Sequence, residues 1–333
     1  MMDTVNLGST GLRVSRACLG TMTFGRQANE AEATRIVDRA LEAGITFIDT
    51  ADAYPIPPDI ATNGLTEEIL GKIIEGRRDQ VVLATKCHFP MGPAAHQSGN
   101  GRLHIRRSVE ASLQRLRTDW IDLFQVHQMD EHTPVEETLD VLEDLRREGK
   151  ILYGGSCNFS PAATAGAAIA AARLGVEGFA CLQPRYNLLH RHCEHATFPI
   201  AKAEGIGVIP YNPLAGGFLT AKHRGSRPDQ DPPDGRFSLP GMSGKTYRRR
   251  YWNDVVFEKA ERIFALCDEA GLAPARVAVG WVLAQEAVTA PILGASNAAQ
   301  LDDVLPAFDE PLSADLLAAL DQATRDSTLD WAQ

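Results

Sequence analysis

Eight short apolar runs are spaced along the chain, and longer segments with helical periodicity lie between them. The runs are residues 18–22, 45–49, 81–86, 121–127, 151–156, 179–183, 206–211 and 291–296. Strands that alternate with helices pair in parallel, and eight repeats fit a closed barrel better than an open doubly wound sheet. The pattern therefore predicts an α/β protein with a (β/α)8 TIM barrel, as one domain over residues 1–333.

Two of the intervening segments show the helical pattern clearly. One apolar face runs from Ile36 to Leu41 after Asn29, a typical helix N-cap, and another runs from Val135 to Leu145 after Pro134. Several segments end in a glycine that is expected to stop the helix before the next strand, namely Gly44, Gly149 and Gly205.

Three segments stand outside the repeat. Residues 3–17 contain two alternating pieces around "GSTG", which predicts an N-terminal β-hairpin covering the bottom of the barrel. The proline-rich residues 55–64 and the longer residues 222–254 both follow predicted strands, on the face where barrel enzymes keep their sites. We expect long active-site loops there. The aromatic residues Tyr247, Tyr251 and Trp252 favour docking of the second loop over a disordered linker.

Composition narrows the class of partner. The 333 residues are 44% hydrophobic and carry a net charge of -10, which disfavours nucleic acid as a ligand. No apolar run approaches the roughly 20 residues of a membrane helix, and the first residues lack a signal-peptide pattern. Six cysteines occur without a CxxC pair, so reduced thiols are expected. We therefore expect a cytoplasmic protein with no membrane or nucleic-acid partner.

One short segment has residues of the kind that bind metals. Residues 190–195, "HRHCEH", crowd three histidines and a cysteine. A solvated loop explains the segment more simply, since short motifs often mislead. We predict no metal site.

Four polar side chains are expected to meet at the barrel mouth. Asp49, Lys86 and His127 end successive predicted strands, and Tyr54 lies five residues beyond Asp49. Strand carboxyl ends converge on one face of a parallel barrel. Singly, each residue has an ordinary structural explanation, as a solvated lysine, a capping aspartate or a packed histidine. Convergence of four complementary side chains favours a catalytic site.

This pattern resembles the aldo-keto reductase family, in which an Asp, a Tyr five residues on, a strand-end Lys and a strand-end His act together. The resemblance extends over nearly the whole chain. Family-like segments occur in the family's order and include "RVSRACLGTMTFG", "VVLATK", "DWIDLFQVHQMD", "GKILYGGSCNFS", "LQPRYNLLHR", "VIPYNPLAGGFLTAK", "RRRYWN" and "PILGASNAAQLDDV".

The resemblance implies NADPH-dependent reduction of an aldehyde or ketone to an alcohol, in a reversible reaction. A phenol of pKa about 10 holds its proton near neutrality, so Tyr54 needs an adjacent cation, which Lys86 would supply. Asp49 would keep that lysine charged and oriented. Hydride from the nicotinamide would reach the carbonyl carbon while Tyr54 protonates the oxygen that His127 orients.

The cofactor is expected to lie across the barrel mouth, because no GxGxxG follows a strand. The resemblance assigns nicotinamide contacts to Asn158 and Gln183 and ring stacking to Tyr211. It implies that the remaining cofactor contacts are Gly20, Thr21, Met22, Asp49, Cys157, Asn212, Pro213, Leu214, Gly216, Lys222, Arg250, Gly294, Ser296, Gln300 and Asp303. NADPH (NADP) is expected, and NADH is possible.

Several departures from the family pattern bear on specificity. Residues 295–300 carry no charge, although relatives that hold the 2'-phosphate often have Arg or Lys there; the helix start in residues 294–303 is a further candidate phosphate site. Cys157 replaces the usual Ser, which predicts looser carboxamide anchoring. Pro55 replaces the usual Gly after Tyr54. Candidates for shaping the substrate pocket are Phe89, Trp120, Trp252 and residues 329–333.

Two alternative functions share these residues. One is a nicotinamide-binding regulatory module that resembles the potassium-channel β subunits. The other is a barrel lyase that uses Lys86 as a Schiff-base nucleophile, which needs a neutral lysine and is disfavoured by Asp49. The sequence leaves open the identity of the carbonyl substrate, the alcohol stereochemistry and the oligomeric state.

Overall fold

Eight parallel strands form one sheet in the order β10-β3-β4-β5-β6-β7-β8-β9 in the computed structural model, which describes residues 2–233 and 235–325. Their bounds are β3 Cys18–Gly20, β4 Phe47–Asp49, β5 Val82–Cys87, β6 Ile121–Val126, β7 Ile151–Cys157, β8 Cys181–Gln183, β9 Gly207–Val208 and β10 Ile292–Gly294. Each predicted apolar run supplies one strand. Backbone hydrogen bonds from Thr289 N to Val208 O (2.8 Å) and from Ile292 N to Pro210 O (2.9 Å) close the ring. The predicted (β/α)8 barrel is confirmed.

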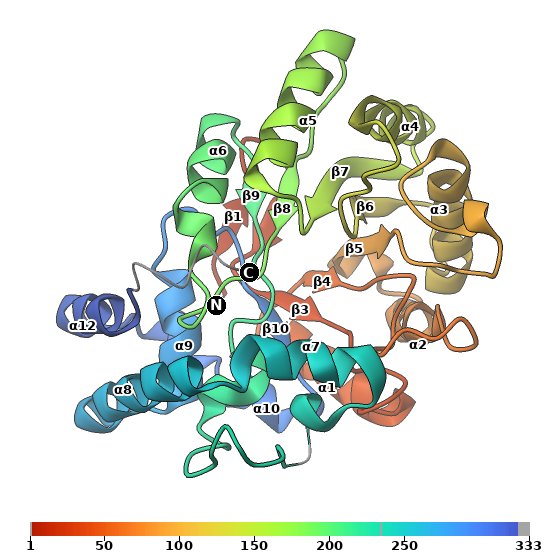
Figure 1. Ribbon diagram of the computed structural model, residues 1–333. Helices are drawn as coiled ribbons and strands as arrows, with labels where there is room; N and C mark the ends of the chain where they lie inside the picture. The colour runs from red at the N-terminus through yellow and green to blue at the C-terminus, as the bar shows by residue number, and fades with distance from the viewer. Residues whose placement is uncertain (1, 234, 326–333) are drawn as a thin grey trace.

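Helices surround this ring: in Figure 1, α1 to α6 follow one another from below the strands round the right to the upper left, and α9 and α8 cover the left side. The helices are α1 Glu30–Glu42, α2 Leu65–Ile74, α3 Arg102–Leu116, α4 Val135–Arg147, α5 Pro161–Leu174, α6 Thr197–Ala203, α7 Gly241–Tyr251, α8 Asp254–Ala270, α9 Pro274–Leu283, α10 Ala299–Asp302, α11 Pro306–Asp309 and α12 Ala314–Thr324. Short 3-10 turns are η1 Arg78–Gln80, η2 Ala95–Gln97, η3 His192–Glu194, η4 Ala215–Thr220 and η5 Arg236–Ser238.

The predicted helix boundaries follow from local chemistry. The side chain of Asn29 accepts a hydrogen bond from Glu32 N and so caps the start of α1. The chain turns at Gly44, Gly149 and Gly205 with φ of 82°, 74° and 66°, a left-handed conformation that glycine adopts without a steric penalty. These glycines therefore end the helices where the sequence predicted.

The N-terminal hairpin closes the amino-terminal end of the barrel, as predicted. Strands β1 Thr4–Asn6 and β2 Arg13–Ser15 are antiparallel. Their turn approaches the start of β9, because Ser9 N donates to Gly205 O at 2.7 Å. Leu7 and Val14 are fully buried in the cluster of side chains that fills the barrel interior. The hairpin thus plugs the barrel end opposite the strand carboxyl ends.

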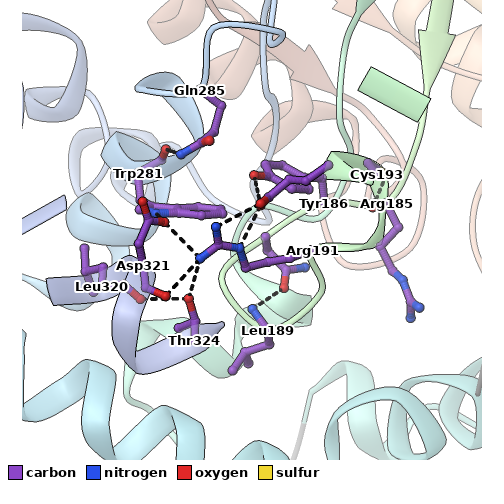
Figure 2. Close-up of polar contacts among 12 residues, drawn as sticks. Arg185, Tyr186, Leu189, Arg191, Cys193, Trp281, Gln285, Leu320, Asp321 and Thr324 are labelled. Atoms are coloured by element: carbon purple, nitrogen blue, oxygen red, sulfur yellow. Dashed lines mark hydrogen bonds and ion pairs between the residues drawn. The ribbon is translucent and has the colours of Figure 1, made fainter. Parts of the chain in front are cut away.

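A buried arginine fastens the C-terminal helix α12 to the segment after β8, as Figure 2 shows. The Arg191 guanidinium pairs with Glu194 at 2.7 Å and with Asp321 of α12 at 2.9 Å. It also donates to the Thr324 hydroxyl at 2.9 Å and lies 4.8 Å from the ring centroid of Trp281. Residues 190–195 therefore have structural contacts of their own, and the residues described contain no group of three His, Cys, Asp or Glu side chains arranged to hold a metal.

Across residues 2–233 and 235–325, no helix is both long enough and apolar enough to cross a bilayer.

Candidate active site

The four predicted site residues meet at the carboxyl ends of adjacent strands. Asp49 ends β4, Lys86 lies near the end of β5, and His127 follows β6. The Lys86 ammonium is 2.6 Å from Asp49 Oδ2 and 5.2 Å from the ring centroid of Tyr54. The Tyr54 and His127 rings lie edge to face, with centroids 5.8 Å apart. We refer to Asp49, Tyr54, Lys86 and His127 as the tetrad.

Asp49 is the centre of a buried polar network. Its Oδ1 accepts hydrogen bonds from the side-chain amides of Gln125 (3.1 Å) and Gln183 (2.9 Å). Its Oδ2 faces Lys86, whose ammonium also donates to Thr50 O at 2.6 Å. A buried carboxylate needs such donors to offset the loss of water. The network therefore fixes the lysine in one orientation.

The electrostatics keep Lys86 charged. Burial alone would lower its pKa, but the charge of Asp49 and the neighbouring Tyr54 phenol raise the pKa of Lys86 above its ordinary value. A protonated amine cannot attack a carbonyl, so this environment disfavours a Schiff-base role.

Tyr54 remains a protonated phenol near neutral pH. Burial raises its pKa to about 12, and the charge of Lys86 offsets only part of that rise. The lysine therefore does not make this phenol more acidic than free tyrosine, contrary to the sequence-based expectation. Its effect is to lower the cost of forming phenolate in a buried site.

His127 is neutral. Burial and the charge of Lys86 hold its pKa well below the ordinary value. Its Nδ1 is buried without a hydrogen-bond partner among the described residues. A neutral imidazole beside Tyr54 can orient a carbonyl oxygen without adding a second positive charge.

A large cavity of about 910 Å³ opens in front of the tetrad. Tyr54, Asp49 and His127 line it, whereas the lining does not include Lys86, which is fully buried. Every residue predicted to contact the cofactor lies on its wall. From β3, β7 and β8 these are Gly20, Thr21, Met22, Cys157, Asn158 and Gln183; after β9 they are Tyr211, Asn212, Pro213, Leu214, Gly216, Lys222 and Arg250; after β10 they are Gly294, Ser296, Gln300 and Asp303.

The profile of the Aldo/keto reductase family matches residues 16–325. The chain belongs to this family. It is an NAD(P)H-dependent oxidoreductase by that membership, and its family acts on small carbonyl compounds.

Similar proteins span almost the same length. An "Uncharacterized oxidoreductase YrpG" of Bacillus subtilis is 39% identical over 328 residues, which cover 96% of this chain and 95% of the relative. A "Probable voltage-gated potassium channel subunit beta" of Arabidopsis thaliana is 34% identical, covering 92% of each chain. The "L-glyceraldehyde 3-phosphate reductase" of Escherichia coli K12 is 30% identical, covering 98% of this chain and 93% of the relative.

In this aldo-keto reductase Cys157 stands where the family usually has Ser, and the neighbouring Asn158 is held by hydrogen bonds. The Asn158 amide donates to His127 O at 3.1 Å and contacts Cys157 Sγ at 3.1 Å. The Tyr211 hydroxyl donates to Asn158 Oδ1 at 2.9 Å. Burial raises the pKa of the Cys157 thiol to about 12, so this thiol is neutral. The wall next to His127 is therefore pre-formed despite the missing hydroxyl.

The long loop of residues 222–254 folds over the cavity, as the sequence predicted. Its residues Gly235, Arg236 and Tyr247 line the wall together with Arg250. The hydroxyl of Tyr251 accepts from the amides of Asn187 (3.1 Å) and Asn212 (2.9 Å), which anchors α7 to the barrel.

Sequence reasoning missed Arg236 as a wall residue. It occurs in "PPDGRF", a polar loop whose cation has no periodic or strand-end signal. Its guanidinium donates to the Tyr247 hydroxyl at 3.1 Å, and its Nη2 lies 3.3 Å from where a Cβ on Gly294 would be. The arginine therefore bridges the loop and the end of β10.

The prediction that Trp120 and Trp252 shape the substrate pocket is wrong. Trp120 precedes β6, so it lies at the opposite end of the barrel, where its indole donates to Asp122 and stacks with Arg78. Trp252 is buried and donates to Gln230 O at 2.9 Å, outside the cavity lining. Phe89 does line the cavity, as do Ile56 and Pro58 after Tyr54. Residues 329–333 lie outside the described residues.

The predicted helix start after β10 is short. Helix α10 has four residues, Ala299–Asp302, so its dipole adds little to phosphate binding. The Gln300 side chain already accepts from Ser296 N at 2.8 Å.

Proposed function

We propose that this chain reduces an aldehyde or ketone to the alcohol with NADPH, reversibly, with Tyr54 as the general acid. A bound reduced nicotinamide would supply hydride to the carbonyl carbon. Tyr54 would give its proton to the carbonyl oxygen, and neutral His127 would orient that oxygen by hydrogen bonding.

The observation that carries the proposal is the buried contact of Lys86 with Asp49 beside the Tyr54 ring. A phenolate forms when Tyr54 loses its proton, and the fixed ammonium stabilises that charge where water cannot. The pair acts only when the negative charge develops, which is the requirement for lowering a barrier.

The cavity supports a dinucleotide. Its volume of about 910 Å³ is at the upper end of the range for small-molecule sites. Two cations on its wall, Lys222 and Arg236, have no carboxylate partner within the residues that the structure describes. Phosphate groups of a dinucleotide would complement them. Two cations favour NADPH over NADH, because NADPH carries an additional 2'-phosphate.

The test is NADPH oxidation followed by absorbance on a panel of simple aldehydes and ketones, with Tyr54→Phe beside the parent. We expect turnover by the parent and a loss of about a hundredfold to ten-thousandfold in kcat in the variant. NADPH affinity should change little, because the phenyl ring remains. Undiminished turnover in Tyr54→Phe would show that another group is the acid.

The similarity to a probable channel β subunit supports one alternative, a nicotinamide-binding regulatory protein. It predicts NADPH binding without turnover on any member of the panel, together with a stable membrane-protein partner. Turnover that depends on Tyr54 would count against it.

A further inference from the structure

Three basic side chains line the cavity, Lys222, Arg236 and Arg250, and a fourth, Arg185, lies beside the wall residue Tyr211. None of the four forms an ion pair with a carboxylate in the described part of the chain. Many other arginines of this acidic protein are paired, including buried Arg191. Unpaired cations that gather around one cavity indicate anionic ligands.

Lys222 and Arg236 form one group on the cavity wall. Lys222 Nζ lies 3.1 Å from where a Cβ on Gly217 or Gly235 would be. Arg236 is close enough to Lys222 to lower the pKa of that lysine, after the larger effect of burial. The cofactor of the proposed function accounts for this group.

Arg185 and Arg250, here called the mouth arginines, form a second group near Tyr211. Arg250 belongs to α7 and lines the cavity. The Arg185 backbone pairs with Tyr211 in a parallel β-bridge, and its guanidinium carbon lies 5.8 Å from the ring centroid of Tyr251, the residue after Arg250. The two arginines therefore flank the same part of the wall.

This part of the wall leads directly to the tetrad. The Tyr211 hydroxyl donates to Asn158, whose amide donates to the backbone oxygen of His127. Burial raises the pKa of Tyr211, and the charges of both mouth arginines oppose that rise, Arg250 more strongly. The positive field thus reaches the surface beside His127.

The neighbours of the mouth arginines do not cancel this field. Figure 2 shows the Arg191 guanidinium among its partners, whereas the Arg185 side chain extends away from that network. Arg185 Nη2 instead lies 3.1 Å from the His190 ring nitrogen Nδ1. Burial and the nearby charges of Arg185, His192, Arg250 and Lys259 lower the pKa of His190 to about 2, so His190 is neutral.

Arg250 was predicted as a cofactor contact, but the nicotinamide ring expected to stack on Tyr211 does not explain two cations at this place. A reduced nicotinamide ring is neutral and an oxidised ring is positive, so neither attracts two guanidinium groups. A negative group on the second reactant does.

We propose that the carbonyl substrate carries a carboxylate or phosphate group, which Arg250 binds at the mouth with Arg185 reinforcing the positive charge behind it. The inference rests on the proposed function and names its substrate class. The anionic group would anchor the substrate while its carbonyl reaches Tyr54 and His127.

The test compares matched substrates in the holoenzyme. One arm pairs 4-carboxybenzaldehyde with its methyl ester, and the other pairs glyceraldehyde 3-phosphate with glyceraldehyde. We expect kcat/KM for the anionic member of at least one pair to exceed that of the neutral member by about tenfold or more. The arm with the larger ratio identifies carboxylate or phosphate.

Variants locate the effect. Arg250→Gln should bring the ratio of anionic to neutral kcat/KM to about one, and Arg250→Lys should restore part of it. Arg249→Gln is the matched control, because Arg249 is exposed on the same helix and absent from the cavity lining. Arg249→Gln should keep the parent ratio. Because it removes the same charge as Arg250→Gln, it separates the effect of the position from that of the net charge.

A binding measurement separates this inference from the proposed reaction. Benzoate and inorganic phosphate are titrated into the NADP-loaded protein by intrinsic fluorescence, with Arg250→Gln in parallel. Weaker binding of either anion to the variant supports the site even if no carbonyl is reduced, in which case only the proposed reaction fails. Equal ratios in parent and variant, anion binding that ignores Arg250, or weaker NADPH binding as the sole defect of Arg250→Gln would overturn the inference.

Discussion

The ammonium of Lys86 lies 2.6 Å from the carboxylate of Asp49, and the two side chains are 0% and 3% exposed. An ion pair this deep loses its hydration, and its attraction repays that loss only when the remaining lone pairs and protons are satisfied. Here two glutamine amides and a backbone carbonyl satisfy them. The pair is therefore intact only as a network, which makes its removal informative.

Lys86→Met should destabilise the protein by about 3 to 5 kcal/mol, because it leaves the Asp49 charge buried without its cation. The double variant Asp49→Asn, Lys86→Met should recover much of that loss, and both should lack turnover. Urea unfolding measures the free energies. Lys72→Met, which breaks an exposed pair with Glu30, is the control and should cost less than about 1 kcal/mol. Additive losses in the double variant would contradict the coupling.

The pKa of Tyr54, raised to about 12, sets the pH dependence in each direction. The phenol stays protonated between pH 7 and 10, so carbonyl reduction should show no inflection from Tyr54 in that range. Alcohol oxidation needs the phenolate, whose fraction grows about tenfold per pH unit below the pKa. Oxidation should therefore rise by about that factor per unit. Steady-state kcat in both directions tests this; a plateau of oxidation near pH 8 would contradict it.

Arg236→Gln should weaken NADPH much more than NADH, by about tenfold or more, if its guanidinium meets the 2'-phosphate. Fluorescence titration with each cofactor gives the two dissociation constants. Arg227→Gln, an exposed position in the same loop, should change neither. Equal weakening of both cofactors would instead assign Arg236 to the diphosphate that they share.

Asp52 offers a test of stability against pH. Burial, with the nearby Glu67, raises its pKa well above the ordinary value. Neither carboxyl oxygen makes a hydrogen bond in the described structure, and the rise in pKa is opposed first by the charge of Arg115 and then by the nearby Ser108 hydroxyl and Ala53 N–H. The unfolded chain ionises at a pKa of about 3.9, well below the folded protein, so the parent loses stability as pH rises.

Asp52→Asn removes that loss and should be more stable than the parent at pH 8, by about 1 to 3 kcal/mol, with a smaller advantage at pH 5. Chemical unfolding at the two pH values measures the difference. Asp229→Asn, at an exposed site, should show no comparable trend. A stability advantage of Asp52→Asn that becomes smaller as the pH rises would mean that Asp52 is ionised and stabilising in the folded protein.

The barrel and the tetrad were predictable because their signals are regular. Each strand is a buried apolar run, and strand carboxyl ends must share one mouth, so Asp49, Lys86 and His127 were brought together before any contact was known. Trp120 was misplaced although the same rule applies, since it precedes its strand and so belongs to the other end of the barrel.

Other features depend on contacts that no local pattern encodes. Arg236 lines the cavity because its guanidinium donates to the Tyr247 hydroxyl of α7, a helix that is itself docked through Tyr251. The net acidity of Tyr54 depends on the balance between burial and one charge, and its direction emerged only from the packed site. Features of this kind depend on packing between segments that are distant in the sequence.

Arg191→Met should destabilise the protein by about 1 to 3 kcal/mol, because it removes the ion pairs of a buried cation with the half-buried Glu194 and Asp321 and its hydrogen bond to Thr324 of α12. Hydrogen exchange should show faster opening of α12 than of α4, which does not contact this network. Lys202→Met, which removes an exposed pair with Glu286, should have little effect on either helix. Uniform acceleration in both helices would mean that Arg191 supports the whole barrel, and protection of α12 equal to the parent would mean that packing of Trp281 and Leu320 alone holds this helix.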